Sequence, residues 1–405
     1  MNDARQLESE VRYYARTFPD VFVSAKGARL RGRSGRAYID FFAGAGTLNY
    51  GHNDPAMKRC LIEYLSGDGI VQSLDMASEA KEAFMSAFHD VVLAPRGMDH
   101  RMLFPGPAGA NAVEAALKLA RKATGRKTVV SFLNAFHGMS MGALAVSRKP
   151  SIPSDPHPPM GGTVFMPYDD TVDALESLFA SDNDKPAACI VETVQAEGGV
   201  VAASADWLRR LREICTQTGV VLIVDDIQVG CGRTGPFFSF ETAGIVPDIV
   251  CLSKSLSGMG LPLALVLVRP PFDKLSPGEH SGTFRGFAPA FITATEALRF
   301  WRDDALEKRT AVMAAMLRGE LERIAAQHLG VICGPVRGRG LIQGLETHSG
   351  EVARRIAAAA FARGLLIETA GPDGEVLKVL CPLTISEEDM HAGLAILDGA
   401  VGDVD

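Results

Sequence analysis

Two short apolar runs in this 405-residue chain each end in a charged side chain that a hydrophobic core would reject. Asp225 follows the run at 220–224, and Lys254 lies just beyond the run at 249–252. Buried strands with polar residues at their carboxyl ends are how an open α/β sheet presents a reactive site. A carboxylate and an amine in one crevice suit pyridoxal 5′-phosphate (PLP), with Lys254 for the Schiff base and Asp225 for the pyridine nitrogen. The alternative is an ion pair at two strand ends.

Asp225 has no lysine or arginine nearby in its own strand, so a buried carboxylate there needs a partner from outside the strand. A protonated pyridine ring supplies one, and the ionised carboxylate keeps that ring positively charged. Lys254 must lose its proton to act as a nucleophile, and a nearby cationic ring with partial burial lowers the pKa of the amine.

A turn and an aromatic residue extend this site. The segment FPGPAGANAVEAALKLAR (104–121) leads from a strand into a helix, whose free N–H groups and macrodipole favour a phosphate. An ordinary strand–helix turn is the alternative. Phe136 follows the next strand and could stack on a planar ring or pack in the core. His137 beside it is more often a structural histidine than a catalyst.

Two glutamates fall on the same predicted edge of the sheet. Glu192 and Glu197 lie at or just beyond the end of an apolar strand. Most loop glutamates are simply solvated. The Gly198-Gly199 pair permits close backbone approach and therefore favours a role for Glu197.

The elements that must position these residues alternate between strand and helix from about residue 100. Near-continuous Val/Ile/Leu runs separated by helices predict an α/β fold with a mostly parallel sheet covered on both faces. We expect strands at 101–104, 128–132, 163–166, 187–192, 220–225, 249–253 and 263–269, and helices at 111–123, 173–181 and 206–218.

The two ends of the chain have a different character. A short amphipathic helix is expected at 7–16 and a disordered loop at 150–162. A helical stretch at 294–326 is followed by strand candidates at 340–346, 365–368 and 376–380, which is typical of a smaller α+β domain. We therefore predict an N-terminal segment (1–55) that joins the small domain, a cofactor-binding large domain (56–305) and a C-terminal small domain (306–405).

Composition excludes several classes of function. The net charge of −7 and the lack of a basic stripe argue against nucleic-acid and membrane-surface partners. Seven scattered cysteines without a CxxC pair predict reduced thiols, no metal site and a cytoplasmic location. The N-terminus lacks the apolar core of a signal peptide. A nucleotide-dependent dehydrogenase is disfavoured because no GxGxxG follows the early strands.

The segments LIVDDIQVGCGRTG, DIVCLSKSLSGMGLP and AGANAVEAALKLAR together resemble the class III (ω-amino-acid) PLP-dependent aminotransferases, over about residues 25–386. The resemblance implies a fold-type I enzyme with a seven-stranded large domain and a small domain built from both termini. It also implies a homodimer with shared active sites.

The resemblance assigns a role to each matching position. It implies that Lys254 and Asp225 are catalytic and that Glu197 forms a carboxylate gate with Lys378, where many members of the family have arginine. The implied cofactor-binding residues are Gly109 and Ala110 at the phosphate, Phe136 and His137 at the ring, Asp225, Gln228 near the phenolic oxygen, Lys254, and Thr283, which reaches the phosphate of the neighbouring subunit.

Within the family, the signature YIDFFAGAGTLNYGHNDP, SKSLSGMGLP, GTFRG and VLKVLCPLTI most resembles the diaminobutyrate–2-oxoglutarate aminotransferases. The implied reaction moves an amino group from L-glutamate to L-aspartate 4-semialdehyde. Transaminases of 4-aminobutyrate, ornithine or acetylornithine remain open, as does a PLP-dependent mutase, racemase or decarboxylase. A regulatory module with a PLP-enzyme fold lacks support, since no DNA-binding segment is fused and Lys254 is present.

Two segments depart from the family pattern. Ala108 and Ala110 stand where relatives tend to have hydroxyl residues, so two phosphate hydrogen bonds are expected to be lost or replaced by water. The segment GFAPAF (286–291) lacks the usual asparagines and, with Gln72-Ser73, alters predicted positions at the subunit edge.

Overall fold

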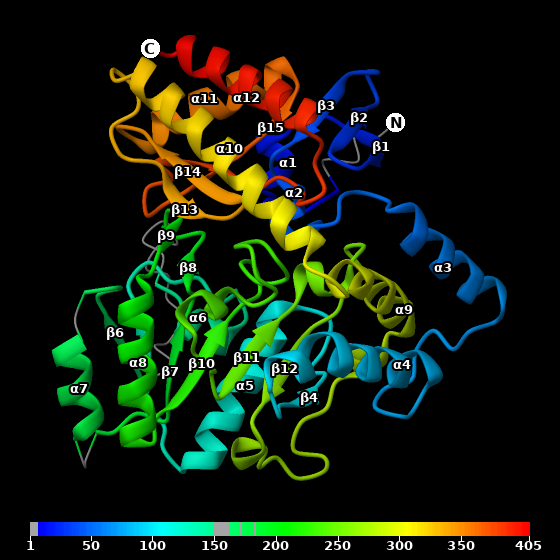
Figure 1. The fold of residues 1–405 in the computed structure, drawn as a ribbon, viewed down its shortest axis with the longest axis vertical. Coiled ribbons are helices and arrows are strands. Elements are labelled where there is room, and N and C mark those ends of the chain that lie inside the picture. The colour runs from blue at the N-terminus through cyan, green and yellow to red at the C-terminus, as the bar shows by residue number, and fades with distance from the viewer. Residues whose placement is uncertain (1–6, 149–161, 171, 182–183) are drawn as a thin grey trace.

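The computed structural model describes residues 7–148, 162–170, 172–181 and 184–405 (Figure 1). Its centre is a seven-stranded sheet in the order β4-β12-β11-β10-β7-β5-β6, in which only β12 runs antiparallel to its neighbours. The predicted α/β fold with a mostly parallel seven-stranded sheet is confirmed. The strands are β4 (Arg101–Leu103), β5 (Val129–Phe132), β6 (Thr163–Met166), β7 (Ala188–Val191), β10 (Val221–Asp225), β11 (Ile249–Leu252) and β12 (Leu265–Val268).

Strand β10 shows why a near-continuous apolar run folds here as a central strand. Successive side chains of a strand point to opposite faces of the sheet. Val221 and Ile223 pack in the cluster that contains α5 (Gly109–Thr124), whereas Leu222 and Val224 pack in the cluster that contains residues of α8 (Ala205–Thr218). Because both faces are covered, Asp225 at the carboxyl end is the first position where the strand can present a polar group.

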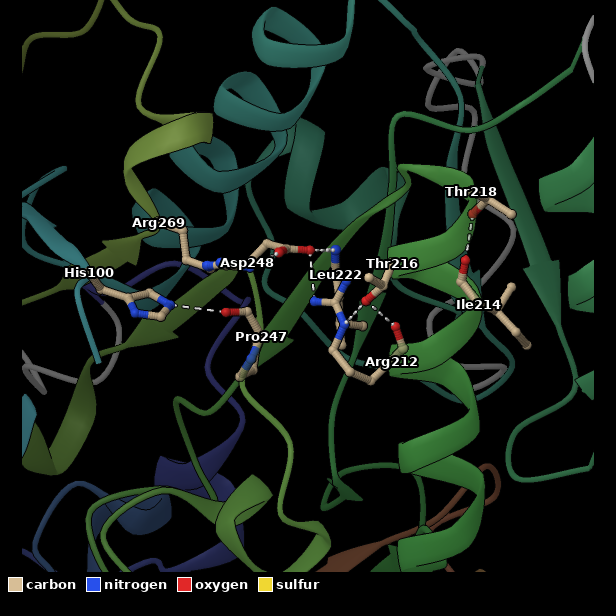
Figure 2. A network of polar contacts seen from close by, with 9 residues as sticks. All are labelled: His100, Arg212, Ile214, Thr216, Thr218, Leu222, Pro247, Asp248 and Arg269. Carbon is tan, nitrogen blue, oxygen red and sulfur yellow. Dashed lines mark hydrogen bonds and ion pairs between the residues drawn. The ribbon is translucent and has the colours of Figure 1, made fainter. Parts of the chain in front are cut away.

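The amino ends of β10 and β11 are held together by one buried carboxylate (Figure 2). Asp248, directly before β11, accepts a hydrogen bond from the Leu222 backbone N–H at 2.9 Å. Its two oxygens also pair with Arg212 at 2.8 Å and with Arg269 at 3.3 Å. A buried carboxylate is tolerated only when it is paired in this way. The network fixes the two strands whose opposite ends carry Asp225 and Lys254.

The N-terminal part of the chain joins the C-terminal part through a shared sheet. Strands β1 (Phe22–Lys26), β2 (Arg29–Gly32) and β3 (Ala37–Asp40) are extended by β15 (Leu365–Leu366), which lies parallel to β3. The first helix, α1, covers only Tyr14–Thr17.

The expected helix at 7–16 is therefore wrong. Leu7 and Val11, which should form its apolar face, are 76% and 86% exposed. Helices this short are marginal in water unless an apolar face packs against the protein.

A second small sheet, antiparallel and ordered β13-β14-β17-β16, follows the long helix α10 (Ala305–Gln327). The helical stretch expected at 294–326 is broken, because α9 (Ala288–Ala297) ends before a 3₁₀ turn at Leu298–Trp301. The strand expected at 365–368 divides between two sheets, with β15 in one and the first residue of β16 in the other. The strands of this sheet are β13 (Arg337–Arg339), β14 (Ile342–Glu346), β16 (Glu368–Ala370) and β17 (Val376–Val379).

The other named elements are α2 (Ala43–Gly46), α3 (Pro55–Ser66), α4 (Glu79–Phe88), α6 (Met141–Ala145), α7 (Val172–Ala180), β8 (Val194–Gln195), β9 (Val201–Ala202), α11 (Gly350–Arg363) and α12 (Glu387–Gly402). The loop expected at 150–162 lies outside the described residues except for Gly162. The domain division at 55/56 and 305/306 stays a prediction. Among the described helices, none combines the length and apolarity needed to cross a membrane.

Candidate active site

A cavity of about 170 Å³ opens at the carboxyl ends of the central strands. It brings together eight of the residues that the sequence predicted for the site. They are Gly109, Ala110, Phe136, His137, Glu197, Asp225, Gln228 and Lys254. Glu192, noted in the sequence without an assigned role, also lines this cavity. Residues from six separate segments therefore meet where the topology of the sheet predicts a site.

Asp225 is held at the base of the cavity by His137. The carboxylate is 5% exposed, and one of its oxygens lies 2.8 Å from His137 Nδ1. The other oxygen accepts a hydrogen bond from the Ile227 backbone N–H at 3.1 Å. Burial disfavours the charged imidazole, but the hydrogen bond and the charge of Asp225 raise the pKa of His137 overall. His137 Nε2 has no hydrogen-bond partner among the described residues.

Lys254 follows β11 directly and has a strained backbone. Its φ of 49° lies in the left-handed region, which is costly for a residue with a side chain. Burial lowers the pKa of its amine; Glu197 opposes that shift and Lys378 adds to it. A larger fraction of the amine is then unprotonated, which is the form that acts as a nucleophile.

The amino end of α5 forms one side of the cavity. Gly109 and Ala110 begin this sixteen-residue helix, whose first N–H groups have no partners within the helix. A Cβ on Gly109 would lie 3.0 Å from the Ile227 side chain, so a larger residue there would have to displace that side chain slightly. The N-cap is Ala108, which has no side-chain oxygen, and its own N–H donates to Asn111 Oδ1 at 3.1 Å. This end of the helix can seat a phosphate.

Phe136 and Glu192 lie together in the wall of the cavity. The Phe136 backbone N–H donates to Glu192 Oε2 at 3.1 Å, and the Tyr168 hydroxyl donates to the Glu192 carbonyl at 2.7 Å. Burial raises the pKa of Glu192 to about 8. Glu192 thus fixes the backbone that carries the Phe136 ring at the cavity wall.

Glu197 and Lys378 meet as the sequence predicted, with 2.6 Å between Glu197 Oε1 and Lys378 Nζ. Gln228 bridges the pair, because its amide donates to Glu197 Oε1 and its carbonyl accepts from Lys378, both at 3.4 Å. The Lys378 side chain is 0% exposed and lies behind Glu197, which faces the cavity.

Sequence reasoning missed a second carboxylate on Lys378. Glu368 Oε1 lies 3.1 Å from Lys378 Nζ, and the two residues are directly opposite each other in the β16–β17 pair. Glu368 ends the apolar run at 365–367, which is the same signal that identified Asp225.

Thr283 lies apart from the cavity of its own chain. It is exposed and begins a 3₁₀ turn at Thr283–Gly286. Its predicted contact with the phosphate of a neighbouring subunit stays a prediction.

The residues present fit PLP. A buried carboxylate suits a protonated ring nitrogen, an unprotonated amine suits an aldehyde, and an open helix terminus suits a phosphate. The described residues contain no group of three or more side chains that could hold a metal ion.

Comparison with known proteins gives the family. The family model Aminotransferase class-III matches residues 13–401. A diaminobutyrate–2-oxoglutarate transaminase of Nocardia farcinica is 51% identical, over 100% of this chain and 94% of its own. One of Halalkalibacterium halodurans is 50% identical, over 99% and 96%.

A solved structure gives a similar result at lower identity. An ornithine aminotransferase of Toxoplasma gondii, described with partial occupancy of PLP at its active site, aligns with a TM-score of 0.88 at 29% identity. The alignment covers 99% of this chain and 93% of that one. Since the family model and these relatives match almost from end to end, this chain belongs to the class III aminotransferases.

Proposed function

We propose that this PLP-dependent aminotransferase transfers the amino group of L-glutamate to L-aspartate 4-semialdehyde, giving 2-oxoglutarate and L-2,4-diaminobutyrate. The observation that carries the proposal is the match of about half of all residues, over the full chain, to relatives named diaminobutyrate–2-oxoglutarate transaminase. The same pocket serves both halves of this reversible, ping-pong exchange.

Five residues of the cavity would hold the cofactor, which supplies an aldehyde for the amine and a ring that accepts electrons. Gly109 and Ala110 would donate backbone N–H groups to the phosphate. Phe136 would pack on the ring, and Gln228 would serve the phenolic oxygen. Asp225 keeps a proton on the ring nitrogen, because an ionised carboxylate stabilises the charge there.

Lys254 moves the proton of the reaction. Its amine would hold the aldehyde of the cofactor and would be free when a substrate amine takes its place. The freed Nζ takes the proton that leaves the donor carbon and later returns it. Asp225 is 5% exposed, so little water reaches the base of the site where the proton is moved.

Glu197 and Lys378 let one pocket accept two kinds of donor. L-Glutamate carries a carboxylate on the reacting carbon, whereas the reacting carbon of diaminobutyrate carries none. Glu197 would cover Lys378 for the diamine and move aside so that Lys378 meets the glutamate carboxylate. The 2.6 Å contact is the arrangement in which Glu197 covers Lys378.

The enzyme would act as a homodimer that shares its active sites. Segment 72–74 lies beside the Thr283 turn, since Ser73 N–H donates to the Gly286 carbonyl at 3.0 Å. Large apolar side chains are exposed along these segments, namely Ile70, Val71, Leu74, Met76 and Phe284. A partner subunit would cover them and place Thr283 at its own phosphate site. All seven cysteines are free, which supports a cytoplasmic location.

A panel of amino donors tests the substrate. With 2-oxoglutarate as acceptor, we expect kcat/KM for L-2,4-diaminobutyrate to exceed that for ornithine, N-acetylornithine and 4-aminobutyrate by at least about tenfold, a difference of one or two well-placed contacts. Glutamate formation is the measurement. A preference for any of the other three donors would contradict the proposed substrate while leaving the aminotransferase chemistry intact.

A further inference from the structure

The ammonium of Lys378 is paired with two carboxylates, whereas a simple ion pair has one. Glu197 lies 2.6 Å from Nζ on the cavity side, and Glu368 lies 3.1 Å from it on the side away from the cavity. Glu368 is 3% exposed and does not line the cavity. The group therefore has two carboxylates around one ammonium, all held by neighbouring strands of the small antiparallel sheet and the loop that contains Glu197.

Tyr14 adds a reason for Glu368 to stay ionised. Its hydroxyl donates to Glu368 Oε2 at 3.3 Å, from the short α1 helix at the other end of the chain. Burial raises the pKa of Glu368 overall; Lys378 opposes that shift and Glu197 adds to it. The 3.1 Å contact with Lys378 and the hydrogen bond from Tyr14 are the geometry that favours the charged carboxylate. With Lys378 protonated, the three side chains carry one excess negative charge.

We propose that Glu368 determines donor specificity, by acting as a permanent second counter-ion that biases the pocket against a carboxylate on the reacting carbon. This inference rests on the proposed function, because it concerns the choice between glutamate and a terminal diamine. Tyr14 is a positioning residue that acts through Glu368.

The bias follows from which charges stay in place during each half-reaction. When the carboxylate of glutamate approaches Lys378, Glu197 moves aside but Glu368 remains on the ammonium. The incoming carboxylate meets a cation that is already neutralised, in a site where little water screens the repulsion. The reacting ammonium of diaminobutyrate has no carboxylate beside it, so Glu197 stays in place and the excess negative charge attracts this group.

The test measures the two half-reactions separately, by the change in visible absorbance of the PLP-bound enzyme with glutamate alone or with diaminobutyrate alone. We expect Glu368→Gln to raise kcat/KM for glutamate and to lower it for diaminobutyrate. The ratio of the two kcat/KM values should change by about tenfold, the size expected when one unit charge is removed a few ångströms from the substrate. Glu346→Gln is the matched control, because it removes a carboxylate from the same sheet, where Glu346 pairs with Arg337. Its ratio should equal that of the unaltered enzyme.

A structural role would lower both rates together, so only opposite shifts support the proposal. Tyr14→Phe provides a second variant, because it removes the hydroxyl and keeps the ring that packs on Tyr13 and Phe42. It should shift the ratio in the same direction by a smaller factor. An unchanged ratio in both variants, or parallel losses in both half-reactions, would overturn the inference. If the unaltered enzyme reacts with glutamate but not with diaminobutyrate, the proposed substrate is wrong, and this outcome is distinct from an unchanged ratio.

Discussion

At Asp225, one hydrogen bond decides how the carboxylate faces the cavity. An ionised carboxylate can only accept, so His137 donates from Nδ1, at 2.8 Å, while the Ile227 N–H fixes the other oxygen. His137 therefore acts through Asp225. The sequence left His137 as either a structural histidine or a catalyst. In the structure it makes a structural hydrogen bond, and that bond orients Asp225, a residue of the site.

Replacing His137 tests this arrangement at the scale of one residue. His137→Phe removes a charge-assisted hydrogen bond within a buried site, and we expect the affinity for PLP to fall by about tenfold or more. His137→Asn retains a donor and should lose less than half of that effect in free energy. Titration of the cofactor-free enzyme with PLP measures both. Equal losses in the two variants would show that ring packing, not the hydrogen bond, holds Asp225.

Among the elements, helix α5 lacks a side-chain cap at its amino end, as both the sequence and the structure show. Ala108 has the extended backbone of an N-cap residue (φ −121°, ψ 155°) but offers no side-chain oxygen to the first N–H groups. Other helices of the chain have such caps: Ser204 accepts from the Trp207 N–H at 3.3 Å at the start of α8.

Restoring that cap should stabilise the enzyme. Ala108→Ser supplies an acceptor for a free N–H of α5, and we expect the free energy of unfolding to rise by about 1 kcal/mol. Ala123→Ser in the last turn of the same helix is the control, because serine there gains no capping role and costs a few tenths of a kcal/mol. Urea denaturation of both variants without PLP measures the difference. A loss of stability in Ala108→Ser would contradict the capping argument.

The elements also show how far local sequence predicts this fold. The central strands were predictable because Val/Ile/Leu runs such as 220–224 are buried on both faces and end at polar residues. The helix expected at 7–16 failed because its pattern was local, and no surface of the protein packs against Leu7 or Val11. Helix propensity alone does not stabilise so short a segment.

The site residues also divide into those that local sequence predicts and those that it does not. Asp225, Lys254 and the start of α5 could be predicted, since each lies at the end of its own strand or turn. Glu368 carries the same local signal, but its contact with Lys378 could not be predicted, because that contact depends on the register of two strands joined by a loop. The proposed contact of Thr283 with a phosphate would depend on a second subunit, which no single-chain pattern specifies.

For the whole molecule, the property to test is the proposed homodimer, in which a partner subunit would complete the site. Phe284 is 61% exposed beside Thr283, and burying an aromatic ring of this size stabilises an interface by about 1.5–3 kcal/mol.

Phe284→Glu places a charge on that surface, and we expect dissociation of the dimer at micromolar concentration, with loss of PLP affinity as the partner's phosphate contact is lost. Val312→Glu is the matched control, because Val312 is 62% exposed on α10, outside the 70–76 and 283–286 segments proposed to meet the partner. Sedimentation velocity and PLP titration measure both. If Phe284→Glu remains dimeric with unchanged PLP affinity, the subunits do not meet at this surface, and Thr283 does not complete a neighbouring site.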